Sequence, residues 1–166
     1  MKDNDVPISS TQPDWSREAQ AIGSWVPSRS LLRSIRSYQR ASGPFGFFKR
    51  RLAVLRHRFW SVVTGADIPI NSSIGGGLLL PHPNGVVIHP NARIGVNCLI
   101  FQQVTIGATQ HGVPTIGGHV DIGAGAKLIG PITVGDHARI GANAVVRENV
   151  PAFGTYVIAA GKLLDS

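Results

Sequence analysis

A six-residue period dominates the sequence from Asp67 to Ile158. An aliphatic residue returns at every sixth position and is usually followed by glycine, apart from one gap of ten between Ile106 and Ile116. This lead set is Ile88, Ile94, Ile100, Ile106, Ile116, Ile122, Leu128, Val134, Ile140 and Val146. A second, mostly small set follows four positions later: Ala92, Cys98, Val104, Val120, Ala126, Ile132, Ala138, Ala144 and Val150. Neither a helix nor a simple strand has a strict period of six, so the pattern predicts a repeat architecture.

The repeat count fits a triangular prism of short parallel strands. Three hexads make a coil of 18 residues, and the 91 residues from 68 to 158 correspond to about five coils. Glycine and asparagine recur between the aliphatic positions, where corners need unusual backbone angles. In such a stack each strand pairs in parallel with the coils above and below. The predicted fold class is an all-β parallel β-helix.

The segment before the repeats has helical periodicity. Apolar residues recur at helical spacing on either side of a break around Gly43, and Gly65 ends the second run. One or two α-helices are therefore predicted before the β-helix. The expected organisation is a flexible arm over 1–27, a basic helical segment over 28–66 and the repeat domain over 67–166.

The charge of the chain is concentrated before the repeats. Residues 1–66 hold 11 Lys plus Arg against 4 Asp plus Glu, which accounts for the whole formal charge of +7, and 19–66 contains no acid. The basic helices have two interpretations: packing on the repeat domain or on a partner subunit, or peripheral contact of residues 29–58 with an anionic membrane surface. No nucleic-acid-binding motif accompanies the charge, so no nucleic-acid partner is expected.

The expected location is the cytoplasm. The start of the chain lacks the basic-then-apolar pattern of a targeting segment, and no run of about 18 apolar residues occurs. Contact at the inner face of the membrane is the alternative that the basic segment leaves open.

Four side chains attract attention for their chemistry. His119 and His137 lie 18 residues apart on neighbouring coils, but no third ligand has a compatible spacing, which favours a solvated pair over a metal site. Cys98 belongs to the small inward set and is expected to be a buried apolar residue. His82 stands between two prolines where the six-residue count slips by two, so the corner there should bulge. The residues alone leave open whether it is a catalytic base or an exposed loop histidine.

Several stretches resemble a known family. The hexads IGVNCL, IGGHVD, IGAGAK, VGDHAR and IGANAV resemble those of acyltransferases built on the left-handed parallel β-helix. The stretch ADIPINSSIGGGLLLPHPNGVVI, with VTIGAT and IGAGAK, is similar to serine O-acetyltransferases and to their short relatives that acetylate exopolysaccharide or capsule sugars. The resemblance covers about 100 of the 166 residues. It implies a homotrimer that transfers acetyl from acetyl-CoA to a hydroxyl, without a metal.

The resemblance also implies a set of site residues. His82 matches the family's catalytic base and Asp67 the acid that orients it, in a direct transfer without an acyl-enzyme intermediate. A histidine suits this role because its ordinary pKa lies near neutrality, and a carboxylate on the far ring nitrogen stabilises the imidazolium. The positions that match the family's CoA-binding residues are Ala108, Thr109, Ala124 and Ala142.

This sequence departs from serine acetyltransferases at the acceptor positions. Pro81 replaces an Asp before the catalytic histidine, and Gly112 and Val113 replace an Arg-His pair. An amino-acid acceptor needs charged partners, so these replacements predict a sugar hydroxyl of a polysaccharide or its precursor as the acceptor. His111 and Gln102 are the candidate acceptor contacts. L-serine is the alternative acceptor. A non-catalytic scaffold and a γ-carbonic-anhydrase-like metal enzyme are the alternatives of other classes.

Overall fold

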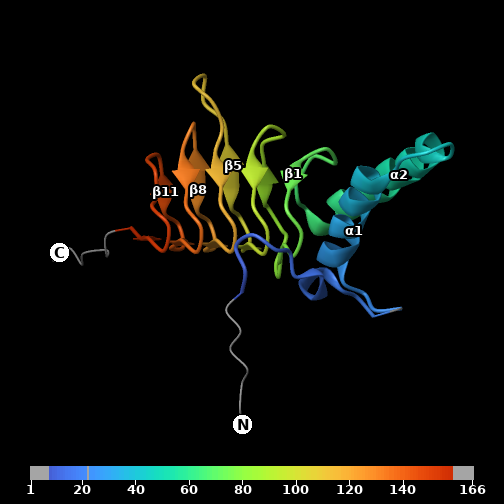
Figure 1. Ribbon diagram of the computed structural model, residues 1–166, viewed down its shortest axis with the longest axis horizontal. Coiled ribbons are helices and arrows are strands. Elements are labelled where there is room, and N and C mark those ends of the chain that lie inside the picture. Colours follow the sequence, from blue (N-terminus) through green and yellow to red (C-terminus); the bar gives the residue numbers. More distant parts are fainter. Residues whose placement is uncertain (1–7, 22, 159–166) are drawn as a thin grey trace, which may run out of the picture.

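The repeat forms a three-sided prism of short parallel strands, with two helices at one end (Figure 1). The computed structural model describes residues 8–21 and 23–158. Within them, twelve strands form three four-stranded faces. Face A holds β2 (Val87–Ile88), β5 (Thr105–Gly107), β8 (Lys127–Ile129) and β11 (Val145–Val146); face B holds β1 (Ser73–Ile74), β3 (Arg93–Ile94), β6 (Thr115–Ile116) and β9 (Thr133–Val134); face C holds β4 (Leu99–Ile100), β7 (Asp121–Ile122), β10 (Arg139–Ile140) and β12 (Thr155–Tyr156).

The pairing register locates the interruptions of the six-residue count. Paired residues are 18 positions apart between β7 and β10, which is the regular coil. The separation is 20 between β1 and β3, 22 between β4 and β7, and 16 between β10 and β12. The two interruptions predicted from the sequence are confirmed. The short last coil was not predicted, and it pairs Val150 with Val134 of the lead set rather than placing it in the second set.

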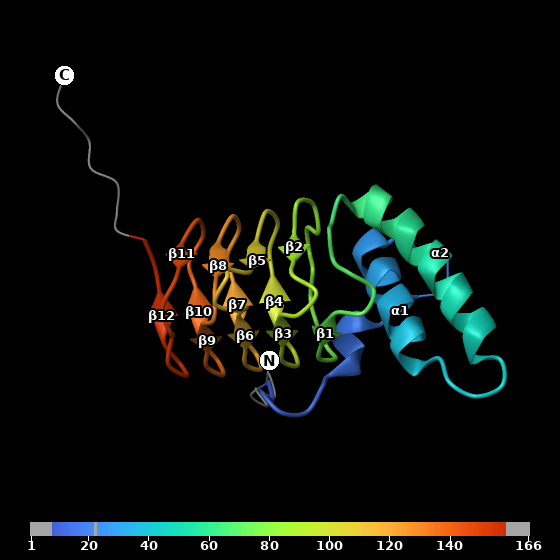
Figure 2. The same cartoon turned by 90° about the horizontal axis from the view of Figure 1, so that it is seen from above.

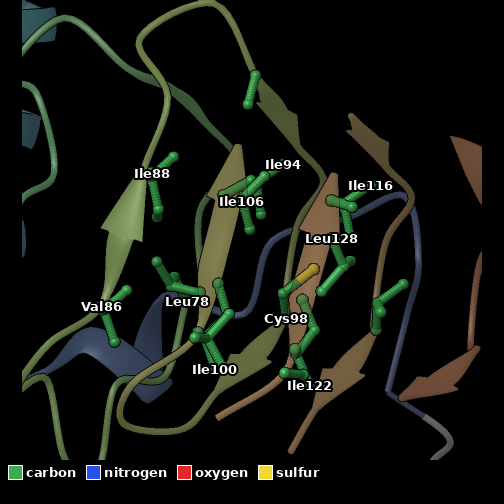
Figure 3. Close-up of a cluster of buried hydrophobic side chains, with 14 of the residues drawn as sticks. Leu78, Val86, Ile88, Ile94, Cys98, Ile100, Ile106, Ile116, Ile122 and Leu128 are labelled. Atoms are coloured by element: carbon green, nitrogen blue, oxygen red, sulfur yellow. The ribbon is translucent and has the colours of Figure 1, made fainter. Parts of the chain in front are cut away.

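Both apolar sets point into the prism. Every member of the lead set and of the second set is at most 4% exposed. Figure 3 shows side chains from all three faces meeting along the axis, with the sulfur of Cys98 among them. Burying one branched side chain contributes about 1.5–3 kcal/mol relative to leaving it in water, so this interior is the main source of stability.

Helices close the first coil of the prism. The 3₁₀ helix η1 (Trp15–Glu18) precedes α1 (Pro27–Arg40) and α2 (Gly46–Thr64). Leu31, Leu32 and Ile35 of α1 are buried in the same apolar cluster as the prism interior. Figure 2 shows α1 between the first coil and α2. The helix therefore shields apolar side chains that an open end of the stack would expose to water.

The described part of the N-terminal arm follows a fixed path along the prism. The Asn97 side chain, which is fully buried, accepts a hydrogen bond from the Asp14 N–H at 2.7 Å and donates to the carbonyl oxygens of Ser9 and Gln12 at 2.7 and 2.8 Å. This differs from the flexible arm that composition suggests, because the binding groups belong to a distant corner. Residues 1–7 of that arm and 159–166 of the predicted repeat domain lie outside the described residues.

Arg36 joins α1, η1 and the first coil. Its guanidinium lies 2.8 Å from the Glu18 carboxylate and donates to the carbonyl oxygens of Ile74 and Gly75, both at 2.6 Å. Glu18 in turn accepts from the Leu78 N–H at 3.1 Å. Both charged side chains are more than nine-tenths buried, so each depends on the other for compensation of its lost hydration.

We expect Arg36→Ala to lower the free energy of unfolding by about 3–5 kcal/mol, because it leaves Glu18 buried without a counter-charge. Urea unfolding followed by circular dichroism measures this. Arg33→Ala, an exposed arginine of the same helix, is the matched control and should change stability by less than about 0.5 kcal/mol. Equal losses for the two variants would contradict the role assigned to Arg36.

Candidate active site

His82 lies on a corner that is longer than its counterparts. The chain passes from face C to face A in six positions from Leu99 to Thr105, but needs eight from Leu79 to Val87. The two additional residues belong to the turn that carries His82, and this side chain is exposed. The flanking prolines restrict the backbone on both sides of it.

The ring of His82 is the one histidine ring without a recorded hydrogen bond among the described residues, which include all six histidines. His57 contacts the Ile68 carbonyl oxygen at 2.8 Å, and burial lowers the pKa of His57. His89 accepts from a backbone N–H of its own turn, and His111 contacts Gln110. Both ring nitrogens of His82 are therefore available to a substrate and to an orienting acid.

Asp67 comes earlier in the chain but lies beside the end of the His82 turn, where it pairs with Val87. Its N–H donates to the Val86 carbonyl oxygen and its own carbonyl oxygen accepts from the Ile88 N–H, each at 2.9 Å. Asp67 thereby adds to face A beside Val87. The Asp67 carboxylate is exposed, and the structure records no hydrogen bond or ion pair between it and the His82 ring among the described residues. The two residues share an edge of the prism, and their pairing stays a prediction.

The corner between faces C and A continues below His82 as a straight edge. Backbone hydrogen bonds link its turns from coil to coil: Gln103 donates to Asn84 at 3.0 Å, Gly125 to Gln102 at 2.9 Å, and Asn143 to Ala124 at 2.8 Å. We call residues 81–86, 101–103, 123–125 and 141–143 the His82 edge. It contains Gln102, Ala124 and Ala142, so the structure brings these three predicted site residues into line with His82.

Polar groups of this edge extend the predicted site. The Gln102 side-chain oxygen is buried and has no hydrogen-bond partner among the described residues, which makes it an acceptor for a ligand donor. Gln103 and Asn84 were missed by the sequence analysis, although they contact each other at 3.3 Å beside His82. Both residues lie in equivalent turns of successive coils. Aligning the coils in the sequence would therefore have marked them as neighbours of His82.

The remaining predicted residues lie on a different corner. Ala108, Thr109 and His111 belong to the long loop between β5 and β6, which connects face A to face B and projects from the prism (Figure 1). Two hydrogen bonds between Thr109 and Gly112, at 2.9 and 3.2 Å, close its tip as a small hairpin. Within one chain the structure does not bring this loop to the His82 edge.

His119 and His137 lie on the corner between faces B and C, where their rings meet edge to face with 5.0 Å between centroids. Their Nδ1 atoms are 2.9 Å apart, and His137 lies parallel to the Phe153 ring with 4.8 Å between centroids. Burial lowers the pKa of His119, so the charged form is disfavoured beside its neighbour. Among the described residues, no three His, Cys, Asp or Glu side chains gather as metal ligands would. The pair therefore lies on a different corner of the prism from the His82 edge.

Comparison with known proteins places this geometry in a family. Residues 114–148 match the bacterial transferase hexapeptide (six repeats) model. A serine acetyltransferase of Helicobacter pylori strain J99 is 43% identical over 126 residues, covering 72% of this chain and 70% of that protein. The chain belongs to the serine acetyltransferase family. The Mycobacterium tuberculosis serine acetyltransferase is 40% identical over 121 residues, covering 69% of this chain and 52% of that protein.

Solved structures of the family confirm the predicted left-handed β-helix. Serine acetyltransferase isoform 3 of Entamoeba histolytica, solved with cysteine, has a TM-score of 0.72 at 31% identity over 86% of this chain. A serine acetyltransferase solved with CoA has a TM-score of 0.67 at 30% identity over 84% of this chain. The chain spans only about half the length of these structures, 51% and 57%, and of the Mycobacterium relative.

Cys98 is chemically protected, as the sequence predicts. Its thiol is fully buried and donates to the Gly117 carbonyl oxygen at 3.2 Å. Burial raises the pKa of the Cys98 thiol to about 11. Since the thiolate is the reactive form, this cysteine is not a nucleophile in the folded protein.

We expect the Cys98 thiol of the folded protein to resist a disulfide reagent such as dithionitrobenzoate at neutral pH, and to react fully in denaturant. The absorbance of the released thiolate measures both. Cys98→Ala supplies the background. Rapid labelling of the native protein, at a rate near that of the denatured chain, would show that the thiol is accessible.

Proposed function

We propose that this protein is an acetyl-CoA-dependent O-acetyltransferase with His82 as its general base. The observation that carries the proposal is the unengaged His82 ring on an extended corner, at the head of an edge that contains Ala124 and Ala142. The names of the relatives support acetyl transfer as the reaction. The CoA complex of a related structure supports the donor.

The reaction is a direct transfer. A ring nitrogen of His82 removes the proton of the acceptor hydroxyl while the oxygen attacks the thioester carbonyl carbon. The tetrahedral intermediate then expels the CoA sulfur, which receives that proton from the imidazolium, giving an acetyl ester and free CoA. Asp67 is the proposed orienting acid. Both side chains are exposed and neither has another side-chain hydrogen bond in the described residues, so neither is committed to a different partner. A carboxylate on the far ring nitrogen would hold the imidazole in one tautomer and stabilise the imidazolium.

The donor site requires a second chain. Small side chains at Ala124 and Ala142 leave the edge open to an extended pantetheine arm, whose amides can bond to backbone groups. Ala108 and Thr109 lie on another corner of the prism, so they reach such a ligand only from a neighbouring copy. We therefore retain the homotrimer: prisms packed side by side would place each projecting loop against the His82 edge of its neighbour.

The names of the relatives support L-serine as the acceptor and do not support the polysaccharide acceptor predicted from the sequence. We therefore propose serine first. A sugar hydroxyl is the second candidate because of one observation: Pro81, Gly112 and Val113 put no charged side chain where an amino acid needs partners. The exposed Gln110 and His111 would contact such an acceptor through hydrogen bonds.

We expect His82→Ala to lower kcat/KM for acetyl transfer by roughly 100- to 10,000-fold, because the hydroxyl loses its proton acceptor. Release of the CoA thiol measures the rate. His89→Ala, which alters a corner histidine away from the His82 edge, is the control and should stay near the parent rate. A His82→Ala variant with parent activity would end the assignment of the base.

An acceptor comparison tests the reaction itself. We expect CoA release from acetyl-CoA with L-serine to exceed that with nucleotide sugars or glycan fragments, with O-acetylserine identified by chromatography. A preference for sugars would move the assignment to the second candidate. If no acceptor responds and calorimetry detects no CoA binding, the chain is a scaffold and the proposed function is wrong.

A further inference from the structure

One face of helix α2 packs against the rest of the molecule, and an apolar stripe on its other side does not. The inner face packs against the rest of the molecule: Ala53 and Thr64 are buried, the His57 ring contacts the Ile68 carbonyl oxygen at 2.8 Å, and Trp60 packs against the core. Figure 2 shows α2 as the outermost element at this end of the molecule. Its other face therefore points away from the prism.

The outward face is a continuous apolar stripe. Its members recur at intervals of four, three, four and three residues, which aligns them along one side of a helix. We call it the outer stripe: Phe48 (70% exposed), Leu52 (58%), Leu55 (64%), Phe59 (55%) and Val62 (84%). It runs for about 21 Å along the helix at 1.5 Å per residue.

This exposure is concentrated rather than scattered. Of the sixteen large apolar side chains that are exposed in the described residues, eight lie between Phe45 and Val63. Single exposed apolar residues are ordinary, whereas a contiguous patch of this size marks a contact surface. The outer stripe is exposed within its own chain, so it does not pack on the repeat domain of that chain.

Basic residues border the outer stripe on both sides. With 100° per residue, Arg51 and Arg58 fall on one flank of the helix and Lys49 and Arg56 on the other. The Arg51 guanidinium lies over the Phe47 ring at 4.8 Å from its centroid. No acidic residue occurs from 19 to 66, so nothing in this segment neutralises the flanks.

We propose that the outer stripe of α2 binds an anionic lipid surface, with the helix lying in the plane of the membrane. The apolar side chains would enter the boundary between headgroups and acyl chains, and the flanking Lys and Arg would extend to the lipid phosphates. None of the described helices is long and apolar enough to cross a bilayer, which agrees with an in-plane helix. Direct packing of two outer stripes from two copies of the chain is disfavoured, because it would bring equally basic flanks together.

Sedimentation of the full-length protein with vesicles tests the proposal. We expect binding to phosphatidylcholine vesicles that contain phosphatidylglycerol, little binding to phosphatidylcholine alone, and weaker binding as salt rises. Arg51→Gln/Arg58→Gln should lower the partition coefficient roughly 25-fold, about fivefold per charge. Arg93→Gln/Arg147→Gln, which removes two exposed arginines of the prism, is the matched control and should bind like the parent.

The apolar contribution is tested separately. Phe48→Ser/Leu55→Ser should lower vesicle binding by at least about tenfold. Phe153→Ser/Val157→Ser removes two exposed apolar side chains at the far end of the prism and should have no effect. Because Phe48 and Leu55 are exposed, the melting temperature of the stripe variant should stay close to the parent value.

Two results would overturn the proposal. One is equal partitioning of the parent protein on neutral and anionic vesicles, or none on either. The other is a stripe variant that changes the sedimentation coefficient without lipid while leaving vesicle binding intact, since that would assign the stripe to contacts between copies.

Discussion

Hydrogen bonding between neighbouring coils is the interaction on which the whole molecule depends. Each strand is two or three residues long and has no stability of its own, so its N–H and C=O groups rely on the coils above and below. Such a stack always has two ends, and the first coil here is closed by α1, with Arg36 and Glu18 fixing the helix to it. The helices are thus part of the domain rather than an appendage to it.

This dependence separates the frame from the chemistry. The strands point their branched side chains inward and leave little room for change, whereas the turns contribute side chains without taking part in the core. His82, Gln102 and the two alanines all occupy turns of one edge. The long loop occupies turns of another, which is why the proposed donor site needs a neighbouring chain.

The sequence predicts the strands better than the site. A strict period of six determines which residues point inward, and both of its large interruptions are visible by counting. The short last coil was missed because Val150 fits the second apolar set as well as the first. The path of the N-terminal arm was missed because its partner, Asn97, lies more than 80 residues away and looks like any corner residue.

The site residues were found largely by resemblance, since the repeat pattern alone does not distinguish a catalytic turn from an ordinary one. The structure adds a criterion that the sequence does not contain: of the six histidines, five have a ring hydrogen bond within the described residues and His82 has none. The structure also shows that the predicted site residues lie on two different corners of the prism. Counting along the chain does not reveal this.

The coils of this prism contain 16, 18, 20 or 22 residues and still stack in the same three columns. In a flat sheet, inserting one residue within a strand turns every following side chain to the opposite face. Here the additional length is confined to a corner and the next strand resumes its place. A change of length in a turn of this fold therefore leaves the strands in register, so segments such as 81–86 and 107–114 can vary in length without disturbing the core.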